Sequence, residues 1–169
     1  MIKQPVASIA LICLSFAVAI PASPQTPAKP ATQKEAAMTS HATGPFDVKV
    51  IPQDDKFDPA LTRFTLDKQF HGDLEATSKG MMLAAGTGAK GSSGGYVALE
   101  VVTGTLHGHT GTFVLQHSAT MNRGVPTMSI TVVPDSGTGE LTGLTGKMNI
   151  IITDGKHSYE FDYTLAPTP

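Results

Sequence analysis

GYVALEVVTGTLHGHTGTFVLQHSATM, residues 95–121, consists of two long runs rich in β-branched and aromatic residues on either side of a glycine-punctuated centre. Runs of this composition are typical of β-strands. The centre, residues 106–111, contains two glycines, and glycine gives the backbone the freedom to reverse direction. The segment is therefore predicted to form one β-hairpin, with polar residues on both of its arms.

The sequence around this hairpin predicts more strands of the same kind. Eight strand candidates follow one another at residues 46–51, 62–70, 74–85, 96–106, 112–121, 126–133, 147–153 and 158–165. Residues 71–73, 122–124 and 154–156 have the composition of tight turns that need positive φ. Only residues 58–62 are expected to hold a turn of helix. Short connections favour antiparallel neighbours, and closure removes exposed edges, so we expect an all-β fold, a closed eight-stranded antiparallel meander barrel.

The composition limits the classes of protein to which the chain can belong. Its 169 residues are enough for one domain with a core, and a formal net charge of −2 provides no basic surface for nucleic acid. Nucleic acid is therefore not expected as a partner. Cys13 is the only cysteine, which excludes an intramolecular disulfide and a cysteine-based metal cage.

The chain divides into three parts by composition. Residues 1–22 carry Lys3, an apolar run and then small residues, which is the pattern of a cleaved secretory signal peptide. The apolar run is too short to span a bilayer, so no stable membrane insertion is expected after cleavage. Residues 23–43 are rich in Pro, Ala and Thr and are predicted to be a linker, and residues 44–169 the barrel domain. We expect a secreted or periplasmic protein.

Four runs of this sequence carry a resemblance to a known family. They are GGYVALEVVTGTL at residues 94–106, GTFVLQH at 111–117, VPDSGTGELTGLTGKM at 133–148 and HSYEFDYTL at 157–165. Together they resemble a bacterial family of unknown function whose members are similar in fold to allene oxide cyclase. The resemblance spans about residues 44–165 and implies a closed eight-stranded barrel. It implies no established activity, and no motif here matches the catalytic residues of the plant cyclases.

Three short motifs have a structural explanation. Residues 86–91 match GxGxxG and residues 91–95 match GxSxG, but both motifs need a helix to follow, and here a strand is predicted. Both are interpreted as parts of a flexible loop. Residues 103–111 and 138–146 share a spacing of Thr, Gly and Leu, which we interpret as two similar hairpin turns.

The arms of the central hairpin hold the candidate ligand-binding residues, His117, Glu100, Tyr96 and Gln116. Side chains alternate between the two faces of a strand, so His117 shares a face with Phe113 and Leu115, which is the better interior. Its alternative role is that of a core histidine held by one hydrogen bond. For the strand of residues 96–106 the periodicity does not decide which face points inward. Glu100 therefore either points into the barrel or is an ordinary surface residue.

No cofactor and no metal site are expected. His107 and His109 lie two residues apart in a predicted turn, but a metal needs a third ligand. His71, His117 or Glu140 could come near in a barrel, but nothing in the sequence shows that one does. The catalytic residues, if the chain has any, are not identified by the sequence.

Three functions are compatible with this pattern. The leading hypothesis is an exported barrel that binds a small apolar or amphipathic molecule, because eight strands leave space for one small ligand. The first alternative is an isomerase or cyclase-like enzyme that acts on a lipid-derived substrate and uses Glu100 or His117 for proton transfer. The second is a structural or interaction module. A homodimer is expected, since residues 96–102 and 148–152 are apolar on both faces.

Overall fold

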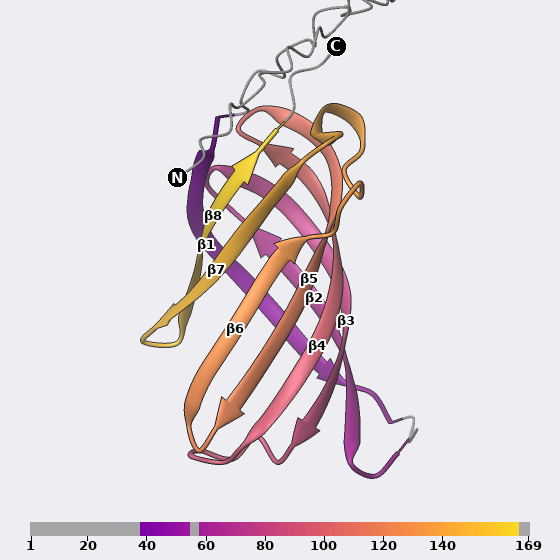
Figure 1. The fold of residues 1–169 in the computed structure, drawn as a ribbon, viewed down its shortest axis with the longest axis vertical. Helices are drawn as coiled ribbons and strands as arrows, with labels where there is room; N and C mark the ends of the chain where they lie inside the picture. The colour runs from indigo at the N-terminus through magenta and orange to yellow at the C-terminus, as the bar shows by residue number, and fades with distance from the viewer. Residues whose placement is uncertain (1–37, 55–57, 166–169) are drawn as a thin grey trace, which may run out of the picture. The chain divides into compact units, whose positions relative to one another are not determined.

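The chain folds into a closed barrel in which each strand pairs with the next, and the last pairs with the first (Figure 1). The strands are β1 (Ser40–Pro52), β2 (Leu61–Phe70), β3 (Leu74–Gly86), β4 (Gly94–Leu106), β5 (His109–Asn122), β6 (Val125–Val132), β7 (Thr145–Thr153) and β8 (Lys156–Thr164). Neighbouring strands are antiparallel throughout. This computed structural model describes residues 38–54 and 58–165. The predicted eight-stranded antiparallel meander barrel is confirmed.

Tight turns join the strands where the sequence indicated them. His107 and Gly108 connect β4 to β5 with φ values of 46° and 87°, and both lie in the left-handed region. Residues 123–124 and 154–155 repeat this geometry between β5 and β6 and between β7 and β8. A two-residue turn with positive φ at both positions matches the right-handed twist of the flanking strands. The turns therefore fix the register of each hairpin.

Residues 58–62 hold one hydrogen-bonded turn rather than a helix: the Leu61 N–H donates to the Asp58 carbonyl oxygen at 3.1 Å, and β2 begins at Leu61. A short 3₁₀ helix, η1 (Gly139–Leu141), lies instead in the β6–β7 loop. Residues 138–146 therefore do not repeat the hairpin turn of residues 103–111, although the two sequences are similar.

The barrel begins before the expected domain boundary. β1 starts at Ser40 and pairs with β8 from Ser40↔Tyr163 to Phe46↔His157, so residues 40–43 are part of the sheet rather than of the linker. The predicted signal peptide, residues 1–22, and linker residues 23–37 lie outside the described residues. Among the described ranges, no helix is long and apolar enough to cross a membrane.

Buried side chains fill the interior at one end of the barrel. The loop between β6 and β7 folds over this end and buries Leu141 and Leu144 completely or nearly so. These two side chains join aromatic and aliphatic residues from the strands, including Phe70, Leu74, Leu106, Phe113 and Phe161. Thr138 holds the loop in place, since its hydroxyl lies 2.6 Å from that of Thr112 on β5. The hydrophobic core therefore occupies this end rather than the whole interior.

The other end is less tightly closed, because the seam between β6 and β7 is short. Only two residue pairs join these strands, Ile130↔Met148 and Thr131↔Lys147. β1 also changes partner at Phe46, from β8 on one side to β2 on the other. β3, β4, β5 and β6 extend beyond the β7–β8 hairpin in Figure 1. The interior at this end is consequently less tightly enclosed than at the packed end.

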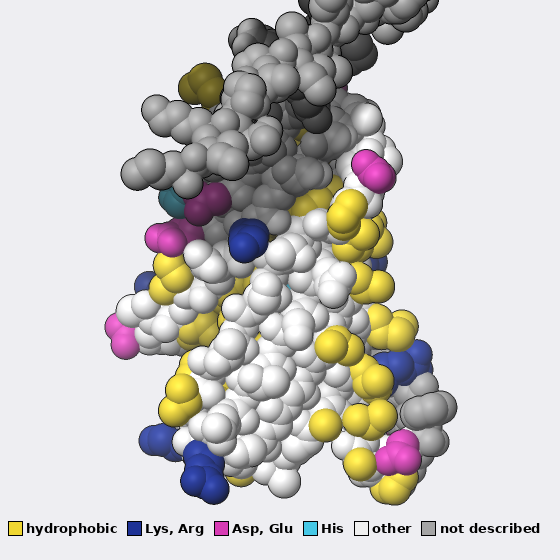
Figure 2. All heavy atoms as spheres, in the orientation of Figure 1, with side chains coloured by type: hydrophobic (Ala, Val, Ile, Leu, Met, Phe, Trp, Pro, Cys, Tyr) yellow, Lys and Arg dark blue, Asp and Glu magenta, His cyan; other side chains and the backbone are white. Residues whose placement is uncertain are grey.

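The outer face of β3 and β4 is unusually apolar. Met81, Leu83, Val97, Leu99 and Val101 are exposed by 36–57% of their surface. Figure 2 shows hydrophobic side chains gathered along the right of the view, where these strands lie. We call these five residues the outer patch.

Candidate functional site

Four polar side chains form a buried layer inside the barrel: Lys68, Ser78, Glu100 and His117. Each comes from a different one of the adjacent strands β2 to β5. Lys68 and Ser78 are direct cross-strand partners, Ser78 pairs with Val102, and Ala98 pairs with His117. Residues on one face at direct or diagonal positions are close enough to interact. The register of the sheet therefore brings all four side chains together, and we call them the polar layer.

Glu100 is the centre of the polar layer. Its carboxylate is fully buried; Oε2 accepts a hydrogen bond from Lys68 Nζ at 2.7 Å, and Oε1 accepts one from Ser78 Oγ. Both carboxylate oxygens are thus engaged. Lys68 Nζ also lies 5.3 Å from the ring centroid of Phe46 and 5.6 Å from that of Phe70, which are favourable distances for a cation–π contact. The buried charges compensate each other.

The surroundings of Glu100 keep it ionised. Burial by itself would raise the pKa of this carboxyl group, because it disfavours the charged form. The contact with His117, the positive charge of Lys68 and the hydrogen bonds from Lys68 and Ser78 outweigh burial and lower the pKa to about 2. Glu100 is therefore a carboxylate at neutral pH.

His117 is the least satisfied member of the layer. Its side chain is 3% exposed, and Nε2 lies 2.9 Å from Oε2 of Glu100. Despite this short distance, Nε2 makes no well-aligned hydrogen bond with Glu100 or with any other residue in the described part of the chain. Buried polar atoms are nearly always paired, so an exception calls for a functional explanation.

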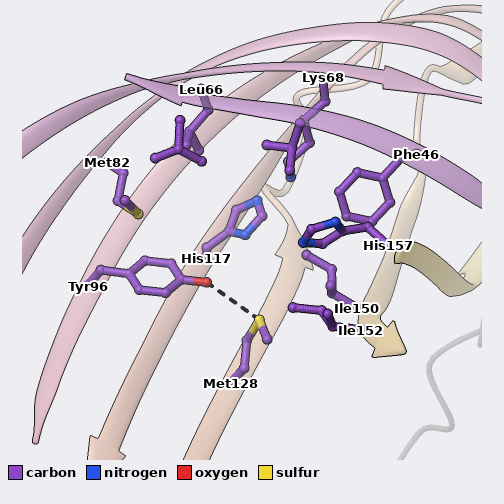
Figure 3. A pocket seen from close by; sticks show the side chains of 12 residues that line it. Phe46, Leu66, Lys68, Met82, Tyr96, His117, Met128, Ile150, Ile152 and His157 are labelled. Atoms are coloured by element: carbon purple, nitrogen blue, oxygen red, sulfur yellow. Dashed lines mark hydrogen bonds between the residues drawn. The ribbon is translucent and has the colours of Figure 1, made fainter. Parts of the chain in front are cut away.

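A cavity of about 230 Å³ lies beside the polar layer and is bounded by side chains from all eight strands. His117 and Lys68 lie at its wall (Figure 3). The other lining residues are largely apolar, namely Phe46, Val48, Val50, Leu66, Met82, Tyr96, Met128, Ile150, Ile152 and His157. Along β2, Phe70 belongs to the packed end, Lys68 to the polar layer and Leu66 to the cavity. On β2 the polar layer thus lies between core and cavity, whereas Phe46 on β1 belongs to both.

Tyr96 adds a further polar group to the cavity. Its hydroxyl is 3.5 Å from the sulfur of Met128, a weak contact that leaves the group able to bind something else (Figure 3). Burial, and then the negative charge of Glu100, raises its pKa above the ordinary value. Tyr96 is consequently a neutral phenol that can donate or accept a hydrogen bond.

The structure settles which predicted residues lie together. His117, Glu100 and Tyr96 point into the barrel, whereas Gln116 is exposed on the outside and does not face the cavity. Gln116 cannot share a face with His117, because adjacent strand residues point to opposite sides. Gln116 lies instead beside Leu83 and Val97 of the outer patch, so the structure does not bring it to the cavity with the other three, and its part in ligand binding stays a prediction.

Two members of the polar layer were missed by the sequence reasoning, Lys68 and Ser78. A signal for Lys68 is present, since Leu66 and Phe70 are apolar at alternate positions and Asp67 and Gln69 are polar between them. This alternation puts Lys68 on the inner face. A lone lysine in a strand is normally on the surface, and Ser78 has no distinguishing pattern.

Of the other histidines, His157 on β8 lines the same cavity, with its ring 5.2 Å from that of Phe46, whereas His107 and His109 lie elsewhere. His107 lies in the β4–β5 turn, where Nδ1 is 2.7 Å from the hydroxyl of Tyr163. His109 is exposed at the start of β5. Over residues 38–54 and 58–165, no three His, Cys, Asp or Glu side chains are grouped so that they could hold a metal ion.

Comparisons with known proteins agree with the barrel. The model of a family described as "Protein of unknown function (DUF3224)" matches residues 42–163. A crystal structure of a DUF3224 protein with unknown function from Shewanella oneidensis is 47% identical, with a TM-score of 0.71. The match covers 78% of this chain and 100% of that chain. No curated protein matches the sequence.

Proposed function

This chain belongs to the DUF3224 family, and we propose that it binds one small, largely apolar or amphipathic molecule in the cavity beside the polar layer. The observation that carries the proposal is a buried histidine at the wall of a largely apolar cavity, whose Nε2 makes no well-aligned hydrogen bond with any described residue. A few placed polar groups in an apolar pocket are the usual composition of a ligand site.

The size of the cavity limits the ligand. An apolar cavity of about 150 Å³ accommodates benzene. The 230 Å³ here is therefore suited to a molecule of roughly ten non-hydrogen atoms. Val50 and Ile152 lie at the cavity and are 47% and 61% exposed. The apolar part of a ligand would cover them, while its polar part contacts Lys68, His117 or Tyr96.

Methionine methyl groups offer a direct test. Met82 and Met128 line the cavity, whereas Met81 is on the outer face directly beside Met82 in the sequence. With [methyl-¹³C]methionine labelling, we expect a small alcohol or ketone such as cyclohexanone to shift the Met82 and Met128 signals saturably. The Met81 signal should not move. Unchanged Met82 and Met128 signals, or equal shifts at all three, would argue against an internal site.

A matched pair of variants checks the location. Val48→Phe should fill the cavity and abolish the shifts of Met128. Val97→Phe adds the same ring on the outer face and should leave binding unchanged. Loss of binding in the second variant alone would place the ligand outside the barrel.

We also propose that the protein acts outside the cytoplasm, as residues 1–22 suggest. Expression of the full chain in a bacterium should yield an exported product cleaved between about Ala19 and Ala22. Intact-mass measurement of the exported protein checks this, and a product that retains Cys13 would contradict it.

A further inference from the structure

His117 has a second nitrogen, Nδ1, that accepts no hydrogen bond from any described residue. Since a carboxylate can only accept, Glu100 beside Nε2 favours the tautomer of the imidazole that carries its proton on Nε2. The lone pair of Nδ1 is then unoccupied. His117 is thus a base, held next to a carboxylate that can stabilise the imidazolium formed when the base takes up a proton.

Lys68 lies next to this base. Its Nζ and Nε2 of His117 both approach the same oxygen of Glu100, at 2.7 and 2.9 Å, and both residues line the cavity. A lysine ammonium carries three N–H donors, and one of them is used by Glu100. The others are available to an oxygen atom in the cavity. The site therefore combines a base with a cationic hydrogen-bond donor in a largely apolar space.

We propose that the chain catalyses proton transfer at the carbon next to the carbonyl group of a small apolar ketone, with His117 as the base and Lys68 as the donor to the carbonyl oxygen. This inference rests on the proposed binding function, because the ketone must occupy the same cavity. Glu100 is a positioning residue, which acts through His117 and Lys68.

The step needs no co-reactant. Nδ1 of His117 takes the proton from the carbon, the C–H electron pair forms the carbon–carbon double bond, and the carbonyl π pair moves onto oxygen. The enolate oxygen accepts a hydrogen bond from Lys68, whose positive charge stabilises the charge that develops there. The imidazolium then returns the proton to the same carbon or, in an unsaturated ketone, to the carbon two positions farther on. The second outcome moves a double bond, which is isomerisation.

Charge balance favours a ketone over a carboxylic acid as the ligand. Lys68 and Glu100 already compensate each other, so a ligand carboxylate would bring an uncompensated negative charge close to Glu100. Burying an unpaired charge is costly. A neutral carbonyl accepts a hydrogen bond from Lys68 without this penalty, and its apolar remainder fits the lining of the cavity.

Exchange of carbon-bound hydrogen in D₂O tests the inference with cyclohexanone as the probe. Proton NMR follows the loss of the signal from the carbons next to the carbonyl, and the methionine labels report binding in the same sample. General base catalysis contributes roughly 10²–10⁴-fold. We expect exchange about 100-fold or more above the buffer rate, and a return close to that rate in His117→Gln.

Further variants separate this role from a structural one. Val48→Phe retains the polar layer and should lose exchange together with binding, whereas Val97→Phe should retain both. Glu100→Gln should lower kcat for exchange while KM changes less than about threefold, since a positioning residue does not contact the ketone. Val48→Phe and Val97→Phe keep the polar layer intact, so they keep the test decisive even if His117→Gln or Glu100→Gln is poorly folded.

The outcomes distinguish the two proposals. If cyclohexanone shifts the Met82 and Met128 signals, but its hydrogens exchange no faster with the natural protein than with His117→Gln, catalysis is refuted and binding stands. If neither shift nor exchange occurs, both proposals fail. If exchange persists in Val48→Phe, it takes place elsewhere, and the inference is wrong.

Discussion

At the scale of single residues, the polar layer concentrates the unusual chemistry of the molecule. Lys68 and Glu100 are 5% and 0% exposed, and each is the charged partner of the other. Lysine and glutamate are almost never fully buried unless paired. A buried pair contributes little net stability compared with apolar residues of similar size, but the loss of one partner is costly. The pair is therefore better explained by function than by stability.

Removal of one charge should destabilise the fold more than removal of both charges. Glu100→Gln leaves Lys68 buried without its anion and should lower the free energy of unfolding by about 3–5 kcal/mol. The double variant Lys68→Met with Glu100→Met removes both charges and should recover most of that loss. Urea unfolding measures both. Equal destabilisation by the single and double variants would mean that the charge pair itself stabilises the barrel.

Protonation of Glu100 at low pH should also destabilise the fold. The folded-state pKa of Glu100, about 2, is below its ordinary value of 4.5, so between these values the unfolded chain binds more protons than the native one. The contribution of Glu100 to stability is present above about pH 4.5 and is lost as the pH falls toward 2. The backbone N–H of Thr43 also lowers the pKa of Asp73, so acid sensitivity alone is not specific to Glu100.

The double variant isolates Glu100 from other acids. Unfolding measured at several pH values from 6 to 2.5 should show a steeper loss of stability in the natural sequence than in Lys68→Met with Glu100→Met. Parallel curves would show that Glu100 does not have the depressed pKa described above.

At the scale of strands and loops, the sequence predicted the elements well and their inner faces less well. All eight strands were predicted because runs of strand-forming residues are separated by turns, most of which contain a glycine with positive φ. On β5, alternation identified His117 as internal. On β4 the alternation could not identify the inner face, because Val97, Leu99 and Val101 are apolar on the outer face as well. The position of Glu100 was therefore decided only by closure of the sheet.

The polar layer could not be assembled from the sequence for a related reason. Its members lie on four strands, and their proximity depends on register, as in the pairing of Lys68 with Ser78 and of His117 with Ala98. A shift by one residue would put each side chain on the opposite face. Turn lengths limit the register, but one sequence does not reveal which charged residues meet across it.

Gly111 shows how closely the β6–β7 loop packs against β5. A Cβ at this position would overlap the carbonyl oxygen of Thr138. Gly111→Ala should displace the loop that buries Leu141 and Leu144 and lower stability by about 1–3 kcal/mol, the range for overpacking. Thermal unfolding and amide hydrogen exchange at Leu141 measure the effect. Thr103→Ala, on the exposed face of the same hairpin, should change neither.

At the scale of the whole molecule, the outer patch remains without an assigned role. Its residues are apolar and exposed, with the polar residues Asp67 and Lys79 beside them. An apolar centre with a polar rim is the usual anatomy of a protein interface. The expected homodimer would use β4, one of the two segments from which it was predicted, and would cover this surface with the same surface of a second copy.

Light scattering across a range of protein concentrations tests the dimer. The natural sequence should show twice the monomer mass, and Leu99→Lys should shift it to the monomer by placing a charge in the centre of the outer patch. Gln69→Lys, on the exposed face of β2, adds the same charge elsewhere and should leave the dimer intact. A monomer at every concentration would contradict the expectation.

The pairing of β1 with β8 makes the sheet a ring, in which Ser40 lies opposite Tyr163. The two ends of the barrel sequence are therefore neighbours in space, and a short linker could join them. A new opening at the exposed turn of residues 154–155 would then leave every strand with its present partners. Circular permutation of this kind should preserve the barrel, because its architecture depends on which strands are adjacent around the ring and not on the strand with which synthesis begins.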